Sequence, residues 1–168
     1  KDTSGAMIVA RTRGAFVYFK KLFKEQKVRK IYSALVWGRV SPPAGVIDKP
    51  IGIIGKSLKR GVESADIKKT APAVTEYKMI GNFSINSKDI SLLEVLPRTG
   101  RTHQIRVHLA SIGHPIIGDK LYGVKLSDAA RQMLHATSLE FDAPDGGHLK
   151  IEAPLPEDFN ERLNGMSR

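Results

Sequence analysis

The chain contains no cysteine among its 168 residues. A disulfide framework, a zinc site built on thiolates and a cysteine nucleophile are therefore all excluded. No apolar run approaches the roughly 20 consecutive residues that a membrane-spanning helix needs. We therefore expect a soluble, cytoplasmic chain.

Acidic side chains are scarce compared with basic ones. The sequence has 27 Lys and Arg but only 17 Asp and Glu, which gives a formal net charge of +10. Such an excess favours a polyanionic partner, because contacts with phosphates release counterions. A basic surface that merely faces solvent would give the same count, so the charge alone leaves both interpretations open.

The patterning predicts one domain over residues 1–168, of the α+β class. Strands and helices mix without a regular βαβ repeat, which favours a largely antiparallel or mixed sheet with packed helices. The predicted strands are 6–10, 28–40, 73–80, 89–96, 137–142 and 148–152. The predicted helices run from an N-cap at Thr12 to about Gln26, from an N-cap at Thr102 to Gly113, over 127–134, and onward from about Pro156. Residues 47–70 predict a long basic surface excursion in which short strands could lie.

One segment gathers cationic and imidazole side chains. It reads RTGRTHQIRVH from Arg98 to His108. The polar residues could be the solvent-facing side of an amphipathic helix. A metal site on His103, His108 and His114 is disfavoured, because spacings of five and six do not stack side chains on one helix face. The third interpretation is an anion site, in which His103 and Arg106 share a face and the guanidinium holds a phosphate or a carboxylate.

The longer segment GRTHQIRVHLASIGHPIIGDKLYG, from Gly100 to Gly123, closely resembles the signature of the RluA-type pseudouridine synthases. KDTSGAMIVA at the start resembles the end of that family's catalytic motif, and KIYSALVWG (Lys30–Gly38) resembles its tyrosine-bearing strand. LHATSLEF (Leu134–Phe141) is similar to a late strand of the family. The resemblance spans nearly the whole chain, and it implies the pseudouridine synthase catalytic-domain fold.

The resemblance also implies that the catalytic nucleophile lies outside this sequence. The family's motif reads His-Arg-Leu-Asp, two variable residues, then Thr-Ser-Gly. Since Thr3, Ser4 and Gly5 fill its last three places, the aspartate is expected immediately before Lys1. Asp2 stands two places too late, a shift of roughly 6–7 Å in a strand, and is not expected to replace it. We therefore expect the chain to be an N-terminally incomplete catalytic domain, inactive alone, which lacks the upstream strands and any RNA-binding module.

Roles for individual residues follow from the resemblance. Arg106 is expected to pair with the aspartate, and Tyr32 to stack on a uracil flipped out of RNA and help remove its C5 proton. The expected substrate-binding residues are Thr3, Arg101, His103 and Gln104. The implied reaction isomerises uridines of RNA and needs no metal or other cofactor. Ribosomal RNA is the substrate expected before tRNA.

Other functions stay open at this level. A non-catalytic RNA-binding or ribosome-assembly protein could have kept the scaffold and lost the nucleophile. A helix-turn-helix DNA-binding protein is disfavoured, because THQIRVHLASIG has no suitable partner helix just before it. Tyr32 could also be an ordinary core aromatic of a strand. The expected partner is RNA and the expected state is a monomer.

Overall fold

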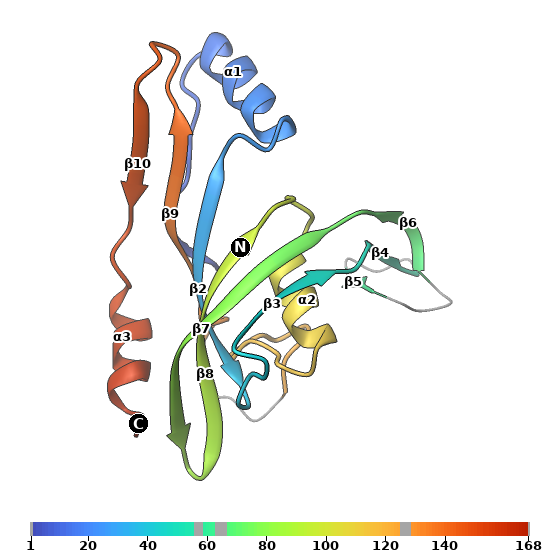
Figure 1. Ribbon diagram of the computed structural model, residues 1–168, viewed down its shortest axis with the longest axis vertical. Coiled ribbons are helices and arrows are strands. Elements are labelled where there is room, and N and C mark those ends of the chain that lie inside the picture. Colours follow the sequence, from blue (N-terminus) through green and yellow to red (C-terminus); the bar gives the residue numbers. More distant parts are fainter. Residues whose placement is uncertain (1, 56–58, 63–66, 125–128, 168) are drawn as a thin grey trace.

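The computed structural model describes residues 2–55, 59–62, 67–124 and 129–167, which build a large twisted sheet, a small second sheet and three helices (Figure 1). The large sheet has seven strands in the order β1-β9-β2-β8-β7-β3, with β10 also paired to β9. Its strands are β1 (Ser4–Gly5), β2 (Arg29–Trp37), β3 (Ala44–Asp48), β7 (Val74–Ile85), β8 (Lys88–Pro97), β9 (Leu134–Asp142) and β10 (His148–Glu152). The β1–β9 pair is parallel and all other pairs are antiparallel. The predicted α+β class with a mixed, largely antiparallel sheet is confirmed.

The centre of the sheet is the β7–β8 hairpin and its neighbour β2. Asn86 and Ser87 form the hairpin turn with φ of 48° and 59°, the left-handed pair that matches the twist of the flanking strands in a two-residue turn. Tyr32 of β2 lies opposite Val95 of β8. The alternating pattern predicted both hairpin strands, although β7 extends five residues further than expected.

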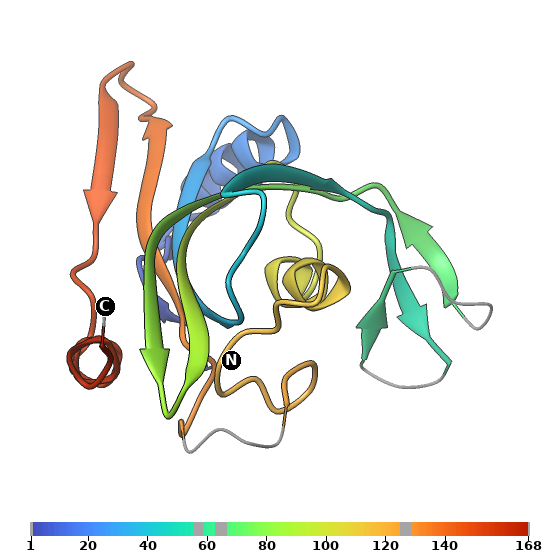
Figure 2. The ribbon, with the colours of Figure 1, turned by 60° about the horizontal axis from the view of Figure 1, so that its bottom comes forward.

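Helix α2 (Gln104–Ser111) lies on the concave side of the curved sheet (Figure 2). Its apolar residues Ile105 and Leu109 are buried in the main core together with Leu35 and Leu93 of the sheet. The predicted N-cap at Thr102 is wrong. The cap position is His103, which has φ 59° and makes no capping hydrogen bond from its side chain.

Helix α1 (Arg13–Lys24) covers the far end of β2 and β9 (Figure 1). Thr12 caps it as predicted, because the Thr12 hydroxyl accepts a hydrogen bond from the backbone N–H of Ala15. Leu22 is buried against Phe141 of β9. In the described part of the chain no helix is long and apolar enough to cross a membrane.

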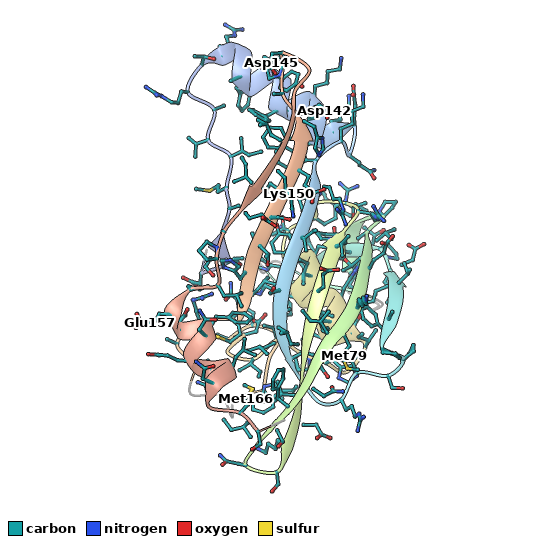
Figure 3. All side chains as sticks on the ribbon, turned by 60° about the vertical axis from the view of Figure 1, so that its left-hand side comes forward. Met79, Asp142, Asp145, Lys150, Glu157 and Met166 are labelled. Atoms are coloured by element: carbon teal, nitrogen blue, oxygen red, sulfur yellow. The ribbon has the colours of Figure 1, made fainter. Side chains whose placement is uncertain are left out.

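Helix α3 (Glu157–Asn164) begins after Pro156, as predicted. Figure 3 shows Glu157 at the start of this helix and Met166 beyond its end, near the β7–β8 hairpin. The side chain of Phe159 is fully buried in the main core. Ser167 then exchanges two backbone hydrogen bonds with Ser84 of β7, which fastens the C-terminal segment to the sheet.

Two further expectations from the sequence are corrected. Residues 6–10 alternate in burial as a strand does, but the only strand here is β1, because the described residues give no ladder partner beyond Ala6. Of the helix predicted over 127–134, residues 127–128 lie outside the described residues and the remainder is not helical. Met133 is extended instead and exchanges backbone hydrogen bonds with Ile117 and Leu35.

Residues 47–70, predicted as a basic surface excursion in which short strands could lie, do contain short strands. Ile47 and Asp48 belong to β3 in the main sheet. Beyond them lies a second sheet in the order β5-β4-β6, made of β4 (Ile51–Ile54), β5 (Arg60–Gly61) and β6 (Ile67–Ala71). Glycine allows the close packing here, since a Cβ on Gly52 would lie 2.2 Å from the Ile67 side chain.

Substitutions at two strand leucines, one buried and one exposed, should change the free energy of unfolding by very different amounts. Leu93→Ala removes a fully buried side chain at the centre of the sheet, so we expect the free energy of unfolding to fall by about 2–5 kcal/mol. Leu149→Ala on β10, where the side chain is 45% exposed, should change it by no more than about 0.5 kcal/mol. Urea unfolding of both variants tests this, and equal losses would contradict the assigned core.

Candidate functional site

A cavity of about 250 Å³ opens where β2 begins, β8 ends and α2 begins. Its wall also includes the start of β9 and the segment just before β1. All six site residues predicted from the sequence line it. The lining consists of Thr3, Lys30, Tyr32, Pro97, Thr99, Gly100, Arg101, His103, Gln104, Ile105, Arg106 and Leu134. Chain segments that are far apart in the sequence therefore meet here.

Strand β2 contributes Lys30 and Tyr32 to the cavity. Side chains two residues apart on a strand point to the same face, so both reach the same wall. The register between β2 and β9 shifts beside Tyr32, because Thr137 of β9 is an extra residue in the ladder. Burial raises the pKa of the Tyr32 phenol and lowers the pKa of the Lys30 ammonium. Tyr32 is therefore a protonated, half-buried ring at neutral pH.

The Gln104 side chain is 4% exposed and its amide is fully engaged by the protein. Its Nε2 donates hydrogen bonds to the Val74 carbonyl and the Thr75 hydroxyl. Its Oε1 accepts hydrogen bonds from the Thr99 hydroxyl and the backbone N–H of Arg101. These four bonds use both donors and both acceptors of the amide. Gln104, expected from the resemblance to bind substrate, thus holds the cavity wall in shape.

The His108 side chain is fully buried on the same helix. Its Nε2 donates to the carbonyl of Lys49 at 2.9 Å, and its Nδ1 lies 2.8 Å from the Thr75 hydroxyl. Burial lowers the pKa of the His108 imidazole and outweighs the hydrogen bond to the Lys49 carbonyl, which acts in the opposite direction. The interpretation of this helix as having a solvent-facing polar side is therefore wrong for Gln104, Arg106 and His108, which are all buried.

Arg106 makes a bidentate ion pair with Asp119. Its Nε and Nη2 donate to the two carboxylate oxygens, both at 2.6 Å. Burial alone would raise the pKa of the Asp119 carboxyl, but hydrogen bonds from Arg106 and from the backbone N–H groups of Leu121 and Tyr122 outweigh it and lower the pKa. The same bonds outweigh the effect of burial on Arg106, so the pKa of its guanidinium is raised. Both groups are charged at neutral pH.

His103 contacts a tyrosine beside this ion pair. The Tyr122 hydroxyl accepts a hydrogen bond from the backbone N–H of Arg60 and lies 3.0 Å from His103 Nδ1. Since one lone pair of the hydroxyl is used by Arg60, its proton is available for Nδ1. Burial and the Arg106 charge lower the pKa of the His103 imidazole. Tyr122 thus links the cavity wall to strand β5 of the second sheet.

Three consecutive residues near the start of the chain are anchored to β9 and to Gln132 just before it. The Thr3 hydroxyl accepts a hydrogen bond from Gln132 Nε2, and the Ser4 hydroxyl lies 2.9 Å from His135 Nδ1. Gly5 has φ 113°, and a Cβ there would lie 2.2 Å from the Ala136 carbonyl oxygen. Only glycine permits so close an approach. The segment Thr3–Gly5 is therefore held rigidly at the edge of the cavity.

Arg101 lines the cavity, whereas Asp2, which is not expected to act as the nucleophile, does not. Arg101 is exposed and its Nε donates to the Pro72 carbonyl. Asp2 is exposed and absent from the cavity lining, yet its charge is among those that raise the pKa of Arg106. In the described part of the chain, no three His, Asp or Glu side chains gather as a metal would require.

Sequence reasoning missed Lys30, Asp119 and Tyr122. Lys30 could have been found from the two-residue period that it shares with Tyr32 on β2. Asp119 and Tyr122 stand in the segment GDKLYG, but no spacing rule connects a loop carboxylate to a helix arginine 13 residues earlier. Their place in the site follows only from the path of the chain after α2.

Comparison with known proteins identifies the family to which the chain belongs. The family model described as RNA pseudouridylate synthase matches residues 1–111. A Chloroflexus aurantiacus protein, named an uncharacterized RNA pseudouridine synthase, is 42% identical over 162 residues, which cover 95% of this chain and 49% of that protein. Ribosomal large subunit pseudouridine synthase D of Nitrosomonas europaea is 38% identical over 99% of this chain and 49% of its own length. The chain spans about half the length of the curated relatives it matches.

Solved structures are similar over nearly the whole chain. Human RNA Pseudouridylate Synthase Domain Containing 1 superposes with a TM-score of 0.84 at 29% identity, over 99% of this chain and 70% of that one. Human RNA Pseudouridylate Synthase Domain Containing 4 gives a TM-score of 0.73 at 27% identity, over 95% and 70%.

The buried His108 predicts a loss of stability in acid. Its pKa in the folded state lies below the ordinary 6.5, so the unfolded chain binds a proton that the folded chain does not. The free energy of unfolding should therefore fall as the pH drops below about 6.5, by up to about 1.4 kcal/mol per pH unit from this group. His108→Gln keeps a donor for the Lys49 carbonyl and should reduce this slope between pH 6.5 and 5. An unchanged slope in urea unfolding across that range would contradict the assignment.

Proposed function

Because the chain belongs to the RNA pseudouridylate synthase family, we propose that it forms most of the catalytic domain of an enzyme that converts uridines of RNA to pseudouridine. The observation that carries this proposal is the shared cavity. The tyrosine, the arginine and the threonine to which the family motifs assign roles all line it. The volume of about 250 Å³ is just below the range of about 300–1,000 Å³ usual for small-molecule sites, which suits one planar base.

The proposed reaction is an isomerisation. The bond between N1 and C1′ of the uridine breaks, the uracil turns, and C5 forms a new bond to C1′. C5 then loses its proton and N1 gains one, so no atom or electron is exchanged with a cofactor. A base stacked in RNA is out of reach, so the uridine must first be flipped into the cavity. Tyr32 stacks on the base there. Because burial keeps its phenol protonated, it can take the C5 proton only by passing its own proton on in the same step.

The electrostatics of the cavity support a nucleophile supplied from just before Lys1. Among its lining residues Lys30, Arg101 and Arg106 are cationic, and none is a carboxylate. A residue three positions before Thr3 lies within about 11 Å of it, and Thr3 is itself at the cavity. An aspartate in that place would complement the cations and pair with Arg106, which keeps it ionised.

Ribosomal RNA is the substrate that we propose first, with tRNA next. Two relatives, from Nitrosomonas europaea and Pseudomonas aeruginosa, are named for the large ribosomal subunit. The formal net charge of +10 suits a polyanionic partner of either kind. The absence of a carboxylate from the cavity lining also leaves room for a second candidate, an RNA-binding protein without catalysis. The residue encoded before Lys1 separates the two, since only an aspartate there completes the catalytic motif.

The first test compares the 168-residue chain with the full-length product of its gene. We expect the full-length protein to release tritium from RNA whose uridines carry tritium at C5, because C5 loses its proton in the reaction. The bare chain should release none, and neither should a full-length variant whose aspartate before Lys1 is changed to Asn. Asp2→Asn in the full-length protein should have only a modest effect. Turnover by the bare chain, or its loss on changing Asp2 alone, would overturn the proposed register.

The second test addresses Arg106 in the same full-length protein. Arg106→Lys keeps the charge but loses the planar fork, so we expect turnover to fall by about 100–1,000-fold while RNA binding weakens much less. Arg98→Lys is the matched control, because Arg98 makes a bidentate pair with Glu76 at 2.7 and 2.8 Å on the exposed surface and does not line the cavity. Near-normal turnover by Arg106→Lys would remove the pairing role.

A further inference from the structure

The buried carboxylate of Asp119 is bound on every side by the protein. Its Oδ2 accepts from Arg106 Nε, and its Oδ1 accepts from Arg106 Nη2 and from the backbone N–H groups of Leu121 and Tyr122. The side chain has no exposed surface, and Asp119 does not line the cavity. With four donors around its two oxygens, it has no free position from which to contact a substrate.

The turn that carries Asp119 cannot readily move. Gly118 has φ 75°, and a Cβ there would lie 2.0 Å from the Arg131 carbonyl oxygen. A Cβ on Gly123 would lie 2.3 Å from the Asp119 carbonyl oxygen, to which the Gly123 N–H donates. The two glycines therefore let both ends of the turn pack closely against their neighbours, where no larger residue would fit. Arg106 has the longer and more flexible side chain of the ion pair. Asp119 therefore sets the position of Arg106, rather than the reverse.

Two contacts fix the guanidinium of Arg106 in three dimensions. The bidentate bond to Asp119 sets the plane and rotation of the fork. The Tyr122 ring, with its centroid 5.1 Å from Arg106 Cζ, supports one face. Nε and Nη2 are used by Asp119, and Nη1 has no hydrogen-bond partner among the described residues. Since Arg106 lines the cavity, Nη1 is the donor left for a group that enters it.

We propose that Asp119 is a positioning residue, which holds Arg106 with its Nη1 donor ready for the carboxylate that attacks the nucleotide. This inference rests on the proposed function, and it adds to that function a residue that acts through Arg106. The role requires the negative charge and both oxygens of Asp119. It predicts that the loss of Asp119 impairs the chemical step much more than the binding of RNA.

The test uses the full-length protein and the tritium-release assay, with turnover divided by the folded fraction measured by circular dichroism. Asp119→Asn keeps the shape and the acceptor for the backbone donors, but it loses the charge and one acceptor for Arg106. We expect kcat to fall by about 100-fold, as a displacement of about 1 Å at a reacting group can cause, while KM stays within about twofold. Asp158→Asn is the matched control, because Asp158 makes the same bidentate contact with Arg131 at 2.7 and 2.8 Å on the exposed surface. It should leave kcat unchanged.

A double-variant comparison separates positioning from general stability. In the Arg106→Lys background, Asp119→Asn should lower kcat by less than about threefold, because the group through which it acts is already lost. If Asp119→Asn does not fold, Asp119→Glu takes its place. Its extra methylene shifts the guanidinium, so kcat should fall at least tenfold with KM held.

The possible failures are distinct. If the unaltered full-length protein forms no pseudouridine, the proposed function fails and the inference falls with it. If it does, and Arg106→Lys is impaired, a normal kcat for Asp119→Asn or Asp119→Glu overturns only the role of Asp119. Equal losses in the two backgrounds would likewise reduce that role to general stability.

Discussion

The site depends on one constraint, which is that the polar side chains buried on helix α2 must all find partners. Gln104, Arg106 and His108 are each less than 10% exposed on a helix of eight residues. A buried polar group without a partner costs about 1–3 kcal/mol, and a buried charge costs more. Their partners come from β7, from the segment after β3 and from the turn after α2. The helix can therefore pack in one orientation only, and that orientation presents its N-terminal end to the cavity.

The parts of the fold that follow from local patterning could be predicted from the sequence. The strands β7, β8 and β10 have alternating or β-branched residues bounded by turn residues, and Thr12 has the side chain that caps a helix. The start of α2 could not be predicted in this way. Thr102 is a good cap by type, but the helix starts one residue later, with His103 at φ 59°. The hydrogen bonds of Gln104 to Val74 and Thr75 are contacts between distant residues that local patterning does not include. Met133 is extended for a similar reason, because backbone partners on Ile117 and Leu35 outweigh its helical preference.

The candidate site, like the fold, has a part that could be predicted from local sequence and a part that could not. Short sequence motifs made it possible to predict four of the site residues. These are Tyr32 in one motif and Arg101, His103 and Arg106 in another. That Arg106 would bind Asp119 in this chain could not be foreseen from its helix, where the nearest expectation was a carboxylate from before Lys1. The two partners are compatible, because a guanidinium has two edges and Asp119 occupies only the Nε–Nη2 edge. What the sequence does not encode locally is which edge is free, since that depends on where Gly118 and Gly123 hold the turn.

The rigidity of these anchors suits the catalysis that we propose for the cationic cavity. Donors that are already aimed at a developing or attacking charge need little reorganisation when the reaction begins, which is a large part of their benefit. Here Arg106 is held by Asp119 and Tyr122, and the segment that would carry the nucleophile is held by Gly5 against Ala136 and by Ser4 against His135. Both sides of the proposed aspartate–arginine pair are therefore fixed to β9 or to α2 before any RNA arrives. The cost of that order falls on the folding of the chain. In the proposed reaction, binding energy from the RNA would therefore remain available for flipping the base.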